Sequence, residues 1–173
     1  MEEYEFTLRY QLSEQNRDHD VLIEILLENG CDDSLIGSGI PGRLALMFSR
    51  DADSAAQALL SALQDVKRAI PDARLIEVVP DLVGLSDIAD IVGVSRQNMR
   101  KLMLSHGASF PLAVHEGSAS VWHLAEVLGW LEGRGYDLQP LMIETAQAAQ
   151  DINLTKATSK LGSVNPEWLA LVL

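Results

Sequence analysis

Hydrophobic and polar residues alternate strictly over residues 4–12, which is the pattern of a strand with one buried face. Helical spacing of apolar residues follows over residues 18–29 and again over residues 54–70. Short apolar runs at residues 33–36, 43–49 and 75–79 predict three more strands. The resulting order, βαββαβ, predicts an α+β fold for residues 1–80, namely a ferredoxin-like sandwich with two helices on one face of an antiparallel sheet.

A different pattern, LSDIADIVGVSRQNMRKLM at residues 85–103, predicts two short helices separated by a glycine turn. Ser86 and Ser95 are suited to cap the two helices, and Gly93 is suited to form the turn. Ala89 is small enough for a close helix crossing. The apolar residues expected to be buried between the helices are Ile88, Val92, Val94, Met99 and Leu102. The segment therefore predicts a helix-turn-helix.

The outward face of the second predicted helix is polar and cationic. Its residues are Arg96, Gln97, Asn98, Arg100 and Lys101, directly after Ser95. Forked or paired donors of this kind fit base edges and phosphates in a DNA major groove. An exposed run of Arg, Gln and Lys is also a common solvated helix face, and helix pairs with a glycine turn occur in proteins that never touch DNA. Both interpretations stay open, and the coincidence of buried spacing with a cationic face favours DNA binding.

The chain after Gly107 predicts a wing. Residues Phe110–His115 and Ser118–Trp122 have the pattern of two short strands joined at Glu116–Gly117. Helical spacing then returns at Leu124, Val127, Leu128 and Leu131.

Residues 82–133 resemble the winged helix-turn-helix of the excisionase, AlpA-like and MerR-like DNA-binding proteins. That family has a helix pair, a Phe-Pro step, a small hairpin and a tryptophan-containing helix. Here they are matched by the segment at residues 85–103, by Phe110–Pro111, by the predicted wing and by Trp130. The match covers about a third of the chain.

The resemblance implies a sequence-specific regulator of transcription that binds double-stranded DNA. Under it, Arg96, Gln97 and Arg100 would read bases, while Lys101 and the wing would hold the DNA backbone. One departure is that the wing carries Glu116 and has only His115 as a possible cation, where the family often places Arg or Lys. The expected DNA-binding residues are Ser95, Arg96, Gln97, Asn98, Arg100, Lys101 and His115.

The net charge of −12 argues against a general nucleic-acid binder covered in cations. Most of the excess negative charge lies outside the predicted winged helix, because residues 1–80 hold 7 Lys or Arg against 15 Asp or Glu. Residues 96–101, in contrast, hold three cations and no acid. A focused basic helix on an acidic body would be repelled from DNA in all but one orientation, which favours specificity over bulk affinity.

The remaining composition indicates a globular protein of a reducing compartment. A chain of 173 residues with 47% hydrophobic content can bury one large or two small cores. The only cysteine, Cys31, allows no internal disulfide, and its expected role is as a small packed residue. The start, MEEYEF, is acidic, and no apolar run is long enough for a membrane span. We therefore expect a cytoplasmic protein.

Catalysis and metal binding are not indicated. The glycine-rich loop at residues 37–42 precedes a predicted strand, so a hairpin loop is favoured over a phosphate-binding loop, which needs a helix start behind it. His106, His115 and His123 lie around the predicted wing without Cys or carboxylate partners at zinc spacing. Acidic residues expected to be solvated at element ends are Glu2, Glu3, Asp32, Asp33, Asp51 and Asp53. With no nucleophile–base arrangement, we expect no enzyme, no cofactor and no metal.

Beyond residue 139 the sequence predicts a helix from Pro140 to about Lys160 with a loose apolar stripe. The stripe consists of Leu141, Ile143, Ala146, Ala149, Ile152 and Leu154. This helix would pack either on a second copy of the protein or on its own domain. The chain ends in an unusually apolar tail made of Trp168, Leu169, Leu171, Val172 and Leu173, which we expect to dock on its own body or on a partner protein.

The sequence thus predicts a module at residues 1–80 for dimerisation, ligand sensing or partner docking, a winged helix-turn-helix at 81–139, and a C-terminal helix and tail at 140–173. The favoured function is a homodimeric transcriptional regulator. The alternative is a winged-helix adaptor in a larger assembly, for example a phage-defence, toxin–antitoxin or mobile-element complex, that binds protein or single-stranded nucleic acid.

Overall fold

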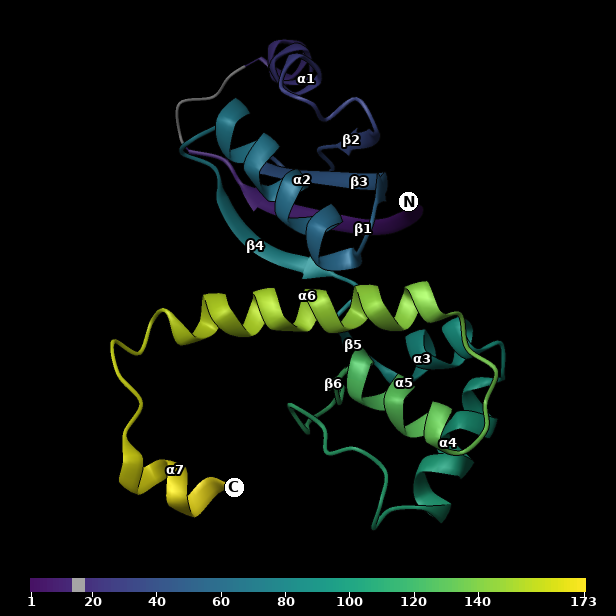
Figure 1. Cartoon of the computed structure of the whole chain (residues 1–173). Coiled ribbons are helices and arrows are strands. Elements are labelled where there is room, and N and C mark those ends of the chain that lie inside the picture. Colours follow the sequence, from purple (N-terminus) through teal and green to yellow (C-terminus); the bar gives the residue numbers. More distant parts are fainter. Residues whose placement is uncertain (14–17) are drawn as a thin grey trace.

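The computed structural model describes residues 1–13 and 18–173, which form a mixed α+β structure (Figure 1). In the N-terminal part the elements follow the order β1, α1, β2, β3, α2, β4. Their bounds are Glu2–Gln11 (β1), His19–Glu28 (α1), Ser34–Gly37 (β2), Arg43–Ala52 (β3), Ala55–Ala69 (α2) and Arg74–Val79 (β4). The strands pair antiparallel in the spatial order β2-β3-β1-β4. The strands and helices expected from the sequence pattern of residues 1–80 are therefore present, and residues 38–42 join β2 to β3 as a hairpin loop.

Strict alternation along β1 places one set of side chains in the core. Phe6 is paired with Phe48 and Leu8 with Leu46 across β1 and β3, and the two phenyl rings stack at 5.3 Å between centroids. Helices α1 and α2 cover this face of the sheet, because Leu26 and Leu59 belong to the same buried cluster. The helices begin where short side chains cap them: Asp18 accepts from the Asp20 amide, and Ser54 accepts from the Gln57 amide.

The second part is built from β5 (Leu82–Val83), α3 (Leu85–Val92), α4 (Arg96–Ser105), β6 (Trp122–His123) and α5 (Leu124–Gly133). Strand β5 pairs antiparallel with β6 and so closes this part around its own buried cluster. Helix α5 contributes the apolar residues that its spacing predicted, since Leu124, Val127, Leu128 and Leu131 are all fully buried.

The expected pair of wing strands is largely absent. Between Phe110 and His115 the chain forms no strand, and a single bridge joins His115 to Val121. Pro111 offers no amide for a ladder, and its carbonyl instead accepts the Trp122 indole N–H at 3.1 Å. The second arm pairs at residues 122–123 with β5 rather than with residues 110–113. The prediction of two paired strands was therefore wrong, and an irregular loop with one bridge takes their place.

Helix α6 (Pro140–Thr158) lies between the two parts (Figure 1). Its Ala149 belongs to the buried cluster of the N-terminal part, whereas Ile143 and Ala146 belong to that of the second part. Of the two alternatives for this helix, packing within its own chain is thus observed. The predicted stripe is correct except at its end, where Leu154 is 44% exposed.

The chain ends in α7 (Pro166–Val172), a short helix capped by Asn165. None of its residues is buried, and Figure 1 shows it apart from the packed parts of the chain. Within residues 1–13 and 18–173, no helix is long and apolar enough to cross a membrane.

Candidate nucleic-acid interface

Helix α3 starts two residues earlier than its predicted cap implied. Ser86 lies inside the helix, and the N-cap is Gly84, whose amide donates to the Asp87 carboxylate at 2.9 Å. Ser86 was therefore the wrong cap. Gly93 ends α3 in the left-handed conformation with φ of 80°, which a glycine adopts without strain, so the predicted turn is confirmed.

Helix α4 begins as the sequence indicated. The Ser95 hydroxyl accepts the Asn98 amide at 3.1 Å, which satisfies one of the free donors at the helix start. Ile88, Ala89 and Met99 are almost fully buried between α3, α4 and α5, while Val92, Val94 and Leu102 are half-buried against them. The packing positions of the predicted helix pair are thus confirmed, and they fix which face of α4 is turned outward.

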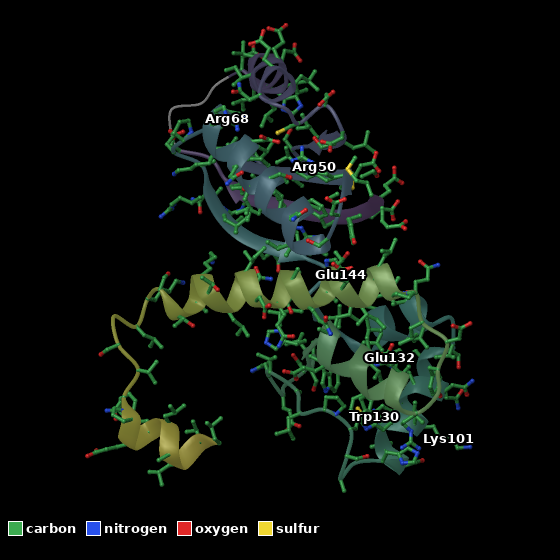
Figure 2. The ribbon with its side chains drawn as sticks, in the orientation of Figure 1. Arg50, Arg68, Lys101, Trp130, Glu132 and Glu144 are labelled. Carbon is green, nitrogen blue, oxygen red and sulfur yellow. The ribbon has the colours of Figure 1, made fainter. Side chains whose placement is uncertain are left out.

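The outward face of α4 carries all of the predicted contact residues of this helix. Arg96, Gln97, Asn98, Arg100 and Lys101 are exposed, as is Ser95 before them. At 100° per residue, Arg96 and Arg100 share one edge of this face, and Gln97 and Lys101 share the next. Figure 2 shows Lys101 pointing away from the packed body. We refer to these six residues as the α4 face.

The cations of the α4 face are not neutralised by neighbours. Within the part of the chain that the structure describes, Arg96, Arg100 and Lys101 form no ion pair and no side-chain hydrogen bond. By contrast, Arg9 and Arg50 in the N-terminal part are both paired with carboxylates. Three charged side chains therefore remain free to meet an external anion.

Two further residues extend this surface, and sequence reasoning missed both. Leu104 is 62% exposed and lies one turn beyond Lys101, near the middle of the outward face. Arg134, at the end of α5, lies over the Trp130 ring at 4.7 Å and donates from Nη2 to His106 Nε2 at 2.9 Å. The sequence could have shown that Leu104 lies on this face, because it follows Arg100 and Lys101 at helical spacing. The Arg134 contact could not, because 28 residues separate it from His106.

The loop at residues 111–121 offers little to a DNA backbone. His115 is exposed, and its ring stands over Gly117, where an added Cβ would lie 2.7 Å from Nε2. The other prominent side chains of the loop are apolar, because Leu112 is 86% and Val114 is 52% exposed. His115 and Glu116 are thus the charged or titratable side chains here, as the sequence indicated.

The three histidines expected around the wing do not come together. His106 contacts Arg134, His115 is exposed in the loop, and His123 Nδ1 lies 2.6 Å from the Asp81 carboxylate. Among the described residues, no group of three or more His, Cys, Asp or Glu side chains is arranged to hold a metal ion.

The acidic residues of the N-terminal part are not all solvated, contrary to expectation. Figure 2 labels the buried Arg50 in the N-terminal part. Asp33 accepts two hydrogen bonds from Arg50, at 2.7 and 2.9 Å, and Asp65 accepts a third at 2.8 Å. Burial lowers the pKa of Arg50, but these hydrogen bonds outweigh it and raise the pKa overall. Cys31 packs beside this group, where burial raises the pKa of its thiol to about 11. This cluster is structural.

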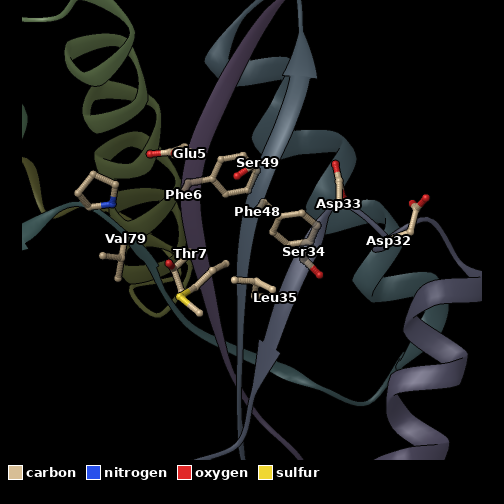
Figure 3. A pocket seen from close by; sticks show the side chains of 12 residues that line it. Glu5, Phe6, Thr7, Asp32, Asp33, Ser34, Leu35, Phe48, Ser49 and Val79 are labelled. Carbon is tan, nitrogen blue, oxygen red and sulfur yellow. The ribbon is translucent and has the colours of Figure 1, made fainter.

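The face of the sheet opposite α1 and α2 is a shallow depression of about 530 Å³ (Figure 3). One lateral row, Val79, Thr7, Met47 and Leu35, runs across all four strands. Met47 is 49% and Leu35 is 71% exposed. Apolar residues on an uncovered sheet face are typical of a contact surface rather than of a catalytic site.

Comparison of the chain with protein-family models, with curated proteins and with solved structures gives no match. Interpretation of the α4 face therefore depends on its geometry and chemistry.

Proposed function

We propose that the chain is a sequence-specific double-stranded DNA-binding regulator of transcription, in which α4 enters the major groove. The observation that carries the proposal is the α4 face, where three unpaired cations and two amide side chains are exposed on a helix that is capped and buried on its other side. Arginine and amide side chains with this freedom are suited to bidentate contacts with base edges.

The architecture supports the same interpretation. A capped helix pair with a glycine turn, the Phe110–Pro111 step and a following helix with Trp130 fit a winged helix-turn-helix with a reduced wing. The βαββαβ order with strand order β2-β3-β1-β4 fits a ferredoxin-like module. We propose that this module pairs two copies through the open sheet face, because one α4 face alone makes few phosphate contacts.

Binding would be orientation-dependent. The body of the protein is acidic, with a net charge of −12, and Asp90 on the preceding helix α3 is also exposed. DNA is therefore repelled from most of the surface and attracted only at α4, which lowers non-specific affinity and leaves base contacts to determine selection.

The proposal is tested by selecting bound duplexes from a random library with the full chain at moderate salt. Affinity for the selected site is then measured for the wild type, Arg96→Ala and Arg100→Ala. Each substitution should cost about 1–3 kcal/mol of binding free energy and relax the preference at one or two bases. Lys101→Ala should weaken binding to all sequences alike and reduce the salt dependence.

Arg74→Ala is the matched control, because Arg74 is an exposed cation on β4. It should leave affinity for the selected site within about twofold, as expected for a surface change away from the interface. Failure to enrich any sequence, or equal affinity of the wild type and an Arg96→Ala/Arg100→Ala double variant, would refute DNA reading by α4.

A second candidate function is favoured by the tail and the loop. Trp168 and Leu171 in α7 are 70% and 84% exposed, and the loop at 111–121 presents Leu112 and Val114 instead of cations. Apolar surfaces of this kind suit an adaptor that binds another protein of a larger assembly. Co-purification of a partner that depends on α7, combined with no selected duplex, would favour the adaptor over the regulator.

A further inference from the structure

A cavity of about 470 Å³ lies where the N-terminal sheet, α3, α5 and α6 meet. Its walls include Glu5 of β1, Ile91 of α3, Leu124 at the start of α5 and Met142 of α6. The volume is in the range of small-molecule sites, and such sites often lie between packed units of a chain. A molecule bound here would contact both of the chain's buried clusters at their boundary.

The floor of the cavity is apolar. Ile91 and Met142 are half-buried, and Leu124 is fully buried behind them. No Lys, Arg or His is present among the described residues that line it. An occupant with an apolar body would therefore remove hydrocarbon surface from water without placing a charge against these side chains.

The buried and charged polar groups of the lining offer acceptors, and the exposed Gln139 amide at the rim is the one side chain with free donors among the described residues of the lining. Thr145 is 3% exposed, and its hydroxyl donates to the Leu141 carbonyl at 2.7 Å. Because a hydroxyl has one proton, Thr145 can offer only its lone pairs to the cavity. Glu3 and Glu5 add two carboxylates, which project from the same face of β1 because they are two residues apart.

No cation of the protein neutralises the carboxylates of Glu3 and Glu5 among the described residues. Neither Glu3 nor Glu5 takes part in an ion pair or a side-chain hydrogen bond with residues 1–13 or 18–173. Glu3 is also paired directly with Asp51 across β1 and β3, an arrangement in which like charges repel. In Figure 3 the Glu5 carboxylate points away from the apolar row of the sheet and toward the yellow-green helix α6.

We infer that this cavity binds a small organic ammonium ion with an apolar body. The cation would lie between Glu3 and Glu5, an ammonium N–H would reach the Thr145 hydroxyl, and the hydrocarbon part would lie against Ile91 and Met142. A carboxylate-bearing ligand would be repelled by the same two glutamates, and a neutral one would leave them uncompensated. The inference does not depend on DNA binding, because the site is formed by other residues.

The test uses the full chain and four probes: phenylbutylamine, phenylbutanol, phenylbutyrate and ethylamine. Binding is measured by calorimetry and by the shift of the Met142 methyl signal in NMR spectra. Phenylbutylamine should bind one to one, about tenfold more tightly than the alcohol, since its charge-assisted hydrogen bonds are stronger. Phenylbutyrate should not bind. Ethylamine should also be about tenfold weaker, because it lacks the apolar body.

Glu3 and Glu5 are exposed, so Glu3→Gln and Glu5→Gln should each weaken phenylbutylamine binding by about two- to fivefold, the range for exposed ion pairs. Glu2→Gln is the control, because it removes the same charge from the neighbouring position on the opposite face of β1. It should leave the affinity unchanged. Two results would indicate simple counterion attraction and would overturn the inference. One is equal affinity for phenylbutylamine and ethylamine, and the other is a loss of phenylbutylamine affinity in Glu2→Gln as large as in Glu3→Gln or Glu5→Gln. Absence of binding at millimolar phenylbutylamine would overturn it as well.

Discussion

The Asp81 carboxylate and the His123 ring meet at the junction of the chain's two parts, with 2.6 Å between Oδ1 and Nδ1. Asp81 is 1% exposed, and its second oxygen accepts from the Asn153 amide of α6 at 2.8 Å. Asn153 in turn exchanges two hydrogen bonds with the backbone of Val78 in β4. One buried carboxylate therefore connects the end of the sheet, the start of α5 and the C-terminal half of α6.

Asp81→Ala should lower the free energy of unfolding by about 1–3 kcal/mol, because it leaves the partly buried His123 Nδ1–H and one of the two Asn153 amide N–H groups without an acceptor. Asp90→Ala removes the same charge from an exposed position on α3 and should change stability by no more than about 0.5 kcal/mol. Urea unfolding followed by circular dichroism measures both. Equal stability of the two variants would contradict a structural role for Asp81.

Glu144 makes a second connection between the parts. Its Oε1 accepts the Ala55 amide at 2.8 Å, at the start of α2, and its Oε2 accepts the Tyr4 hydroxyl at 3.1 Å. Burial and this hydrogen bond both raise the pKa of Tyr4. A carboxylate at a helix start also compensates the positive end of the helix dipole.

Glu144→Gln should therefore destabilise the protein by about 1 kcal/mol, since one amide oxygen cannot replace two charged acceptors. Glu132→Gln, at an exposed position of α5, removes an equal charge without those contacts (Figure 2). Thermal unfolding of the two variants provides the measurement. A melting temperature of Glu144→Gln equal to that of Glu132→Gln would show that the hydrogen bonds contribute nothing.

Local sequence signals predicted most of the elements. Ser95 could be assigned as a cap because its partner, Asn98, is only three residues away. Ser86 was expected to cap α3, whereas Gly84 takes that position and Asp87 supplies the carboxylate from within the helix. The exact position of a helix start, here two residues from the predicted one, depends on backbone geometry that no residue type specifies alone.

Long-range contacts could not be predicted. Asp33 looked like a solvated strand end, yet 17 residues later Arg50 provides its partner. Asp81 and Asn153 are separated by 72 residues, and no local sequence pattern indicates that two such distant polar residues are in contact. The α4 face was accessible to sequence reasoning because all its residues lie on one short helix. The cavity between the sheet, α3, α5 and α6 was not, because its walls come from five separate segments.

Cys31 is fully buried, and the raised pKa of its thiol has a consequence at alkaline pH. The folded-state pKa of about 11 lies above the ordinary thiol pKa of 9.0, so folding favours the neutral thiol. The associated stability is fully present below pH 9 and is lost as the pH rises toward 11. A two-unit difference corresponds to about 2–3 kcal/mol.

The measurement is the free energy of unfolding between neutral pH and pH 11 for the wild type and Cys31→Ala. Between pH 9 and pH 11 the wild type should lose more free energy of unfolding than Cys31→Ala. Burial also raises the pKa of Tyr10, but Tyr10 is present in both proteins and contributes equally to them. Parallel pH profiles would show that the thiol does not ionise on unfolding. Thiol reagents should likewise label Cys31 at pH 8 only after unfolding.

The exposed tail separates the two candidate functions. Because Trp168 is 70% exposed and α7 has no buried residue, deleting residues 163–173 should leave the melting temperature nearly unchanged. Acrylamide should quench a large part of the fluorescence of the full chain, and Trp168→Phe should remove that part. Trp122→Phe is the control, since Trp122 is only 6% exposed and its loss should leave the quenchable part intact.

Sedimentation of the same deletion variant then identifies what the tail contacts. If α7 serves a partner protein, the deletion should keep the oligomeric state and the binding of selected DNA while losing co-purification with that partner. If α7 packs on a second copy, the deletion should dissociate the dimer at micromolar concentration. If acrylamide does not quench Trp168 and the deletion also lowers the melting temperature strongly, the tail is not exposed. The regulator and adaptor functions would then have to be compared on the α4 face alone.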